Sequence, residues 1–151
     1  MKAHKLVTLL FIFMLTAASM AQNFDHAQCF PKAAAGGKKS DPVKGVFRID
    51  GSAKQIQFLD KHGSAVVNIK MENVKSIVYE RTAKPRYAEG LLIAWPLLFT
   101  KSKSHYLTIQ YSDEKEGSQY AIIRLDKSNY RDALASLEAQ TGRTVQRSEE
   151  G

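Results

Sequence analysis

The sequence predicts one mainly β domain with a single C-terminal helix, in which a bent antiparallel sheet forms a partly open barrel capped by that helix. Between residues 43 and 125, apolar side chains alternate with polar ones and turn signals interrupt the runs, as in antiparallel strands. After residue 128 the period changes, because Tyr130, Ala133, Leu134 and Leu137 recur at helical spacing. One narrow helix stripe needs a partner, so it is predicted to pack on the sheet.

Individual strands are delimited by turn residues. The Asp60 to Gly63 turn begins with a side chain that can bond the backbone and ends with a residue that tolerates a left-handed conformation. For the helix, Asp126 or Ser128 is expected to cap the start and Gly142 the end. The predicted elements are strands over 43–50, 55–60, 65–70, 74–81, 105–111 and 119–125, and a helix over 128–140.

The first 21 residues are predicted to be a cleaved signal peptide. They combine a basic start, an apolar stretch and the small-x-small exit Ser19-Met20-Ala21. The apolar run over 6–20 is shorter than the roughly 20 residues of a membrane-spanning helix. Cleavage is expected after about Ala21, and the mature protein is expected to be secreted or periplasmic.

The remaining chain is predicted to contain one folded unit. Residues 22–42 contain little large apolar surface to bury, so they are predicted to be a flexible tether. The folded domain is predicted over 43–145 and a disordered tail over 146–151. Cys29 is the only cysteine, which excludes an intramolecular disulfide, and its place in the tether predicts an accessible thiol.

The charge distribution argues against a nucleic-acid partner. With 22 basic and 15 acidic residues the formal charge is +7, and loss of Lys2 and Lys5 with the signal leaves 20 − 15 = +5. No run of five or more basic residues occurs in the sequence. A modest excess of dispersed lysine is typical of a solvated protein surface.

No catalytic or metal-binding constellation is found in the sequence. Gly-x-Ser-x-Gly and His-Glu-x-x-His are both absent. Asp25, His26 and Cys29 supply three metal-ligating residue types, but structural zinc needs four ligands and a preorganised site. A strand-borne set of tyrosines is better explained by cross-strand pairing than by a stacking platform. We therefore expect a non-enzymatic protein without a cofactor or metal.

The apolar segment after residue 90 is the strongest candidate for an interaction. Nine consecutive uncharged residues are too few to span a bilayer as a helix. Three interpretations stay open: a buried part of the core, a self-association surface, or a membrane-contacting loop with lysines near anionic headgroups. The residues of this candidate site are Leu91, Leu92, Ile93, Trp95, Leu97, Leu98, Phe99, Lys101 and Lys103.

The order of elements resembles the pleckstrin-homology-like (PH-like) superfold, including its GRAM-type versions. The features that carry the resemblance are the Gly45-Val46-Phe47-Arg48-Ile49 opening, the Ile56-x-Phe58 strand, the Asn73-Val74-Lys75-Ser76-Ile77 strand entry and the C-terminal helix. Secreted bacterial proteins of unknown function are similar to this pattern. The resemblance implies a binding scaffold more than an activity.

Together these features predict an exported, non-enzymatic binding domain that acts by protein interaction or self-association. Its partner would be another protein or a second copy of the chain. The alternative is a peripheral membrane module, in which residues 91–99 and the flanking lysines contact an anionic membrane surface.

Overall fold

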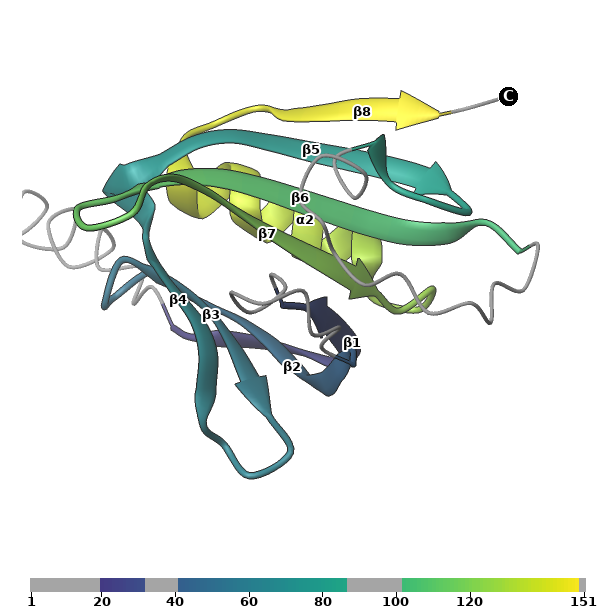
Figure 1. Ribbon diagram of the computed structural model, residues 1–151, viewed down its shortest axis with the longest axis horizontal. Coiled ribbons are helices and arrows are strands. Elements are labelled where there is room, and N and C mark those ends of the chain that lie inside the picture. Colours follow the sequence, from purple (N-terminus) through teal and green to yellow (C-terminus); the bar gives the residue numbers. More distant parts are fainter. Residues whose placement is uncertain (1–19, 32–40, 87–101, 150–151) are drawn as a thin grey trace, which may run out of the picture.

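The computed structural model describes residues 20–31, 41–86 and 102–149 (Figure 1). These residues form a mainly β structure with one α-helix near the C-terminal end. In chain order the elements are β1 (Gln22–Phe30), β2 (Val43–Asp50), β3 (Gln55–Asp60), β4 (Ala65–Lys70), the 3-10 turn η2 (Met71–Asn73), β5 (Val74–Thr82), β6 (Ser104–Asp113), β7 (Gly117–Leu125), α2 (Tyr130–Thr141) and β8 (Val145–Glu149).

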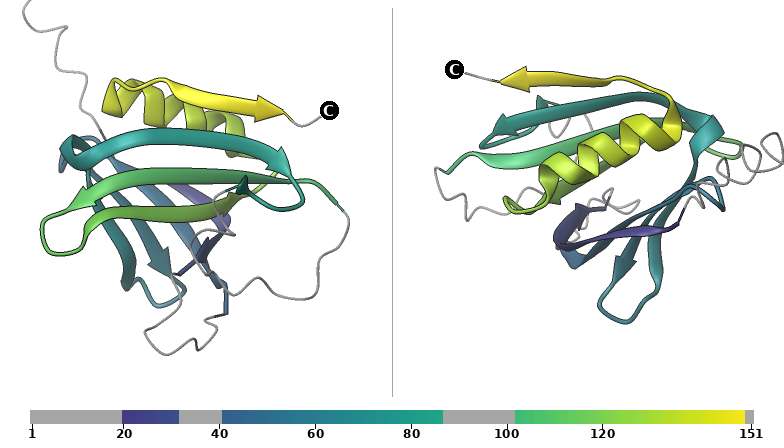
Figure 2. Two further views of the ribbon diagram at one scale, coloured as in Figure 1. Left: turned by 45° about the horizontal axis from the view of Figure 1, so that its top comes forward. Right: turned by 180° about the vertical axis from the view of Figure 1, so that it is seen from behind.

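The eight described strands form one sheet in the order β4-β3-β2-β1-β7-β6-β5-β8. Neighbouring strands are antiparallel except for β5 and β8, which are parallel. The sheet bends strongly between β1 and β7, so that the half formed by β1–β4 lies at an angle to the half formed by β5–β8, and both halves contribute to one core (Figures 1 and 2). Its ends, β4 and β8, do not pair with each other, so the expected barrel is an open, bent sheet.

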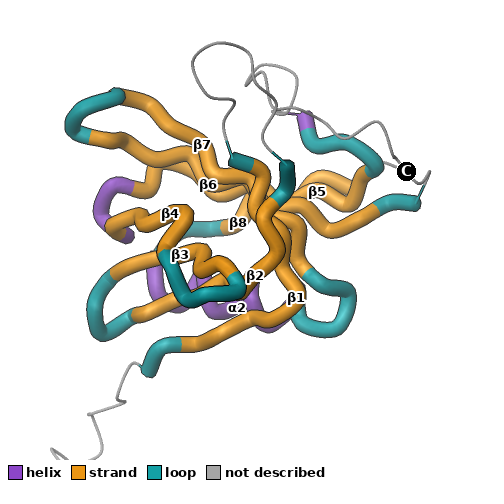
Figure 3. Tube along the Cα trace, turned by 60° about the horizontal axis from the view of Figure 1, so that its bottom comes forward, coloured by secondary structure: helices purple, strands orange, loops and turns teal. Residues whose placement is uncertain are grey.

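The main core lies where the concave side of this sheet meets α2. The helix contributes Ala133, Leu134 and Leu137, all of which are buried. It lies behind β1 and β2 in the view of Figure 3 and contacts both strands. The predicted helical stripe is therefore confirmed as the face that packs on the sheet. The largest fully buried side chains of the sheet are Phe47, Phe58, Ile49, Ile56, Ile69, Ile77, Leu107, Ile109, Ile122, Ile123 and Val74.

The tether predicted over 22–42 is wrong for its first part, because Gln22–Phe30 is the strand β1 in the middle of the sheet. β1 pairs with β2 on one side and β7 on the other. Its register shifts between Phe24 and Ala27, so buried residues stand three apart rather than two. That bulge hides the strand from a period-two search. Residues 32–40, the rest of the predicted tether, lie outside the described part.

The tail predicted over 146–151 is also wrong where the structure describes it, because Val145–Glu149 is the edge strand β8. Among residues 145–148, whose burial is described, only Val145 is buried in the core, so the sequence carries little strand signal. Glu138 of α2 supplies the missing anchor: its carboxylate accepts a bond from the Val145 N–H at 3.0 Å and pairs with Arg147 at 3.4 Å. A contact from α2 thus holds this strand in addition to its parallel pairing with β5.

The predicted turns and helix end agree with the structure, whereas the predicted helix start does not. Asp60 accepts bonds from the backbone N–H groups of His62 and Ser64, and Gly63 has φ of 80°. Gly142 ends α2 in the left-handed conformation. The residue before α2 is Asn129, which makes no side-chain capping bond. Neither predicted cap is used, because the Asp126 carboxylate instead binds both the N–H and the hydroxyl of Ser128.

Candidate binding surface at the β4 edge

The candidate site predicted from the sequence falls largely outside the described residues. Residues 91–99 and Lys101 are not among them, so the three interpretations of that segment remain open. Lys103 is described and is exposed just before β6. No helix in the described part of the chain is long and apolar enough to cross a membrane.

The Asp25, His26 and Cys29 combination does not form a metal site in the structure. Within residues 20–31, 41–86 and 102–149, no group of three metal-ligating side chains comes together. Cys29 points into the core and is only 1% exposed. Burial raises the pKa of its thiol to about 12, which makes the thiolate inaccessible at neutral pH. The expectation of an accessible thiol is therefore wrong.

The strand tyrosines are dispersed and do not form a stacking platform. Tyr79 is buried in the main core, while Tyr106 is buried on the opposite face of the sheet. There the Tyr106 ring packs against Phe30, with centroids 6.0 Å apart. Burial raises the pKa of Tyr106. Both tyrosines serve packing, and the contact of Tyr106 with Phe30 reaches across the intervening strand β7.

The free edge of β4 is the clearest place where the backbone can bind something. β4 pairs with β3 in the register Ile56↔Ile69 and Gln57↔Asn68. The Met71 N–H donates to the Lys54 carbonyl, which fixes the phase of hydrogen bonding in this ladder. Because bonded and non-bonded pairs alternate in antiparallel sheets, the Ile56–Ile69 pair is bonded and the Gln57–Asn68 pair is not.

It follows that Asn68 and Lys70 direct their backbone N–H and C=O groups away from β3. Since β4 is an end strand, no described strand receives these groups. Val66, which precedes them, sits at a bulge without a partner in β3 and is 37% exposed. Lys70 is the N-cap residue of η2, so its carbonyl accepts the first bond of that turn. The edge available at the end of β4 therefore consists of the N–H and C=O of Asn68 and the N–H of Lys70.

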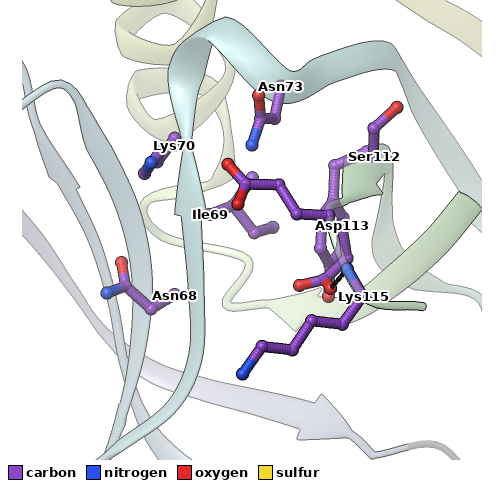
Figure 4. A pocket seen from close by; sticks show the side chains of 9 residues that line it. Asn68, Ile69, Lys70, Asn73, Ser112, Asp113 and Lys115 are labelled. Carbon is purple, nitrogen blue, oxygen red and sulfur yellow. Dashed lines mark hydrogen bonds between the residues drawn. The ribbon is translucent and has the colours of Figure 1, made fainter. Parts of the chain in front are cut away.

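A cleft of about 290 Å³ lies beside this stretch. One wall is the end of β4 with η2, and the other is the tip of the β6–β7 hairpin (Figure 4). Ile69 points from β4 toward the hairpin, and the Lys115 side chain extends from the hairpin toward β4 (Figure 4). The cleft is lined by Asn68, Ile69, Lys70, Asn73, Tyr111, Ser112, Asp113, Glu114 and Lys115.

The charges of the cleft divide into structural and available groups. Asp113 shapes the hairpin, because its carboxylate accepts bonds from the N–H groups of Lys115 and Glu116. These bonds lower the pKa of Asp113 and keep it ionised. Burial, with the nearby Asp113 and Glu116 charges, raises the pKa of Tyr111, so its hydroxyl stays neutral. Lys70 and Lys115 remain as cations on opposite walls.

This arrangement suits recognition of an extended chain. The edge offers alternating donors and acceptors, and the cleft offers room for side chains of an added strand. Sequence reasoning identified the strand but not its edge position. Strand order is a tertiary property, and the alternating pattern of residues 65–70 fits an inner strand as well as an outer one.

Comparisons with known proteins bear on the fold. No family model matches this chain, and no curated protein matches it. Among solved structures, a chain of the Spt16D–Pob3N heterodimer is similar with a TM-score of 0.54 at 10% sequence identity, over 87% of this chain and 56% of that one. This chain therefore spans little more than half the length of that protein.

A second similar structure is the hSac2 domain of the human phosphoinositide phosphatase Sac2. It has a TM-score of 0.49 at 12% identity, covering 99% of this chain and 90% of that one. At such low sequence identities a structural similarity is informative about the fold alone. The argument for the fold rests on the first of the two structures, the chain of the Spt16D–Pob3N heterodimer. The bent sheet closed at one side by a C-terminal helix is consistent with the PH-like fold class.

Proposed function

We propose that this chain is an exported, non-enzymatic binding domain that takes an extended segment of a protein partner as an added strand on β4. The observation that carries the proposal is the outward direction of the Asn68 and Lys70 backbone groups at an open sheet edge. A peptide strand placed there would satisfy those groups as β3 satisfies the other side of β4.

The energetics favour a segment that is already extended. Each backbone hydrogen bond adds a net stabilisation of about 0.5–1.5 kcal/mol, so the few bonds available at Asn68 and Lys70 need support from side chains. The cleft between β4 and the hairpin provides that support through Ile69, Tyr111 and Lys115. Backbone pairing would give affinity, and the residues entering the cleft would give selectivity.

Export rests on the sequence, and the position of β1 supports it. The predicted cleavage after Ala21 leaves Gln22 as the first residue, and β1 begins at Gln22. Removal of the signal would then leave the central strand whole. A non-enzymatic role is supported by the site itself, where Asp113 is engaged by backbone N–H groups and only Lys70, Lys115 and Glu114 carry other charges.

A proline substitution at Asn68 tests the proposal. Asn68→Pro removes an N–H that points away from β3, so the β3–β4 ladder survives while the outer edge loses a donor. Asn68→Ala removes the side chain but keeps the donor. Linear peptides selected from a phage-displayed library on the wild-type protein should bind Asn68→Ala normally and Asn68→Pro at least about tenfold more weakly.

Equal binding of the selected peptides to Asn68→Pro, with its melting temperature unchanged, would reject the β4 edge, as would failure to select any peptide. Sedimentation equilibrium of the wild-type protein addresses the second-copy partner. If the wild-type protein forms a dimer and Asn68→Pro dissociates it, the β4 edge is still the binding site, but its partner is a second copy of the chain.

Membrane contact through residues 91–99, Lys101 and Lys103 remains the alternative function. It rests on the sequence alone. Co-sedimentation of the protein with vesicles containing phosphatidylserine tests it, and binding that Trp95→Ser abolishes would favour it over the β4 edge.

A further inference from the structure

A second cleft, at the opposite end of the strands, gathers positive charge. It has a volume of about 400 Å³ and is built from four parts of the chain: β1, the start of β2, the β3–β4 turn and the end of β7. The residues that line it are His26, Ala27, Gln28, Lys44, Gly45, Lys61, Arg124 and Asp126.

Three of the residues that line this cleft are cations: Lys44, Lys61 and Arg124. Within the described residues, none of Lys44, Lys61 and Arg124 forms a salt bridge. The single acid, Asp126, is held by two hydrogen bonds from Ser128. Those bonds, with smaller effects from the His26 and Arg124 charges, lower the pKa of Asp126. Asp126 is therefore committed to the turn before α2, so that three cations and one engaged acid are found among the lining residues described.

The wall of this cleft is held in an uncommon backbone conformation. His26 has φ of 59°, in the left-handed region that non-glycine residues seldom occupy. The conformation lies in the β1 bulge, and the Asn129 side-chain amide fixes it by donating to the Asp25 carbonyl at 3.0 Å. Such outliers persist where surrounding contacts impose them and are frequent at ligand sites.

The floor of the cleft is also constrained. Gly45 lies so close to β3 that a Cβ atom there would stand 1.9 Å from the Leu59 carbonyl oxygen. β2 can therefore approach β3 at this point only with glycine. Bulge and glycine together place the Lys44 side chain and His26 on a defined surface rather than on a free loop.

We propose that this basic cleft binds an acidic segment of a protein, with glutamate or aspartate side chains paired to Lys44, Lys61 and Arg124. A concave surface receives a chain segment, whereas a flat bilayer contacts protruding groups. Carboxylates spaced along a peptide can reach cations that come from three separate parts of the chain: β2, the β3–β4 turn and β7. The surface lies at the other end of the strands from the β4 cleft, so this inference does not depend on the proposed strand addition.

Charge reversal tests the proposal. The probe is a fluorescein-labelled octaglutamate peptide, and binding is followed by anisotropy at two salt concentrations. Lys44→Glu combined with Lys61→Glu should weaken binding at least about tenfold, because each exposed pair contributes modestly and reversal also adds repulsion. The matched control is Lys75→Glu combined with Arg81→Glu, which makes the same change in net charge at two exposed positions of β5 that line neither cleft.

The result supports the cleft if the control pair binds within about twofold of wild type at the same ionic strength. Equal weakening by both pairs would show attraction by net charge alone and overturn the site. Absence of octaglutamate binding would also overturn the site. If the protein then bound phosphatidylserine vesicles through this cleft, the surface would be a lipid contact. None of these results decides whether a strand adds to β4, because Lys44 and Lys61 do not line the β4 cleft and Asn68 does not line the basic cleft.

Discussion

The hydroxyl oxygen of Tyr79 lies 2.7 Å from Nδ1 of His105, which joins the ends of β5 and β6 beneath the start of α2. The Tyr130 ring of α2 stacks on His105, with ring centroids 3.9 Å apart and an interplanar angle of 14°. Arg131 in turn lies 5.6 Å from the Tyr130 ring centre. In the neutral tautomer that carries its proton on Nε2, the Tyr79 hydroxyl donates this bond to Nδ1 of His105.

This stack predicts that acid weakens the fold through His105. Burial is the main cause that lowers the pKa of His105 below its ordinary 6.5. The positive charges of Arg81, Lys127 and Arg131 lower this pKa further, whereas the Asp126 carboxylate opposes them. The unfolded chain therefore takes up the proton first. Stability from this group is complete above about pH 6.5 and is lost as pH falls from there toward the folded-state pKa. Thermal melts between pH 8 and 5 should show a steeper decline for wild type than for His105→Gln, which keeps an acceptor but does not titrate. Parallel curves would contradict the prediction.

Cys29 should resist modification in the native protein. Its side chain is buried in the core and its pKa is raised to about 12 by burial, so neither access nor thiolate is available. Maleimide should react slowly with the native reduced protein and rapidly in guanidinium chloride. Fast labelling under native conditions would mean that β1 detaches from the sheet.

The helix stripe should be a major source of stability. Leu134→Ala removes a buried side chain from the contact between α2 and the sheet and should cost about 2–5 kcal/mol of unfolding free energy. Ala135→Gln, exposed on the same helix, should change the unfolding free energy by well under about 1 kcal/mol. Urea denaturation of the two variants measures both values. Similar costs for the two would remove α2 from the core.

Glu138 should control the C-terminal strand. Its carboxylate holds the Val145 N–H and Arg147, so Glu138→Ala should release β8 while the remaining strands keep their order. Hydrogen exchange should speed up at Gln146 and Ser148 but not at Leu107. Glu138→Gln keeps one acceptor and loses the ion pair, so its exchange should be intermediate. Unchanged protection of β8 in Glu138→Ala would show that pairing with β5 suffices.

Gly45 should not tolerate a side chain. Gly45→Ala places a carbon against the Leu59 carbonyl, which belongs to the backbone and cannot rotate away. Overpacking of this kind costs about 1–3 kcal/mol, measured as a lower midpoint in urea. Gly117→Ala, in the β6–β7 hairpin, has open space around it and tests left-handed strain alone (φ of 75°). A stable Gly45→Ala would mean that β2 and β3 can separate locally.

Strands whose burial alternates strictly could be predicted from the sequence, and the structure places them with small changes at their ends. β2 and β3 follow that rule, with Phe47, Ile49, Ile56 and Phe58 buried at every second position. β1 broke it, because the bulge separates Phe24 from Ala27 by three residues. β8 carried almost no apolar signal, since a carboxylate from α2 anchors it.

Local sequence determined what local physics controls: the period of the apolar residues, the Asp60 and Gly63 turn and the helix stop at Gly142. Tertiary structure alone decided which strand ends the sheet, and with it the exposed backbone of Asn68 and Lys70. It also decided which lysines from distant segments share a cleft. The reason is that alternation records how a strand divides between buried and solvated faces, whereas edges and clefts arise from the order in which distant strands pair, and that order leaves no local mark in the chain.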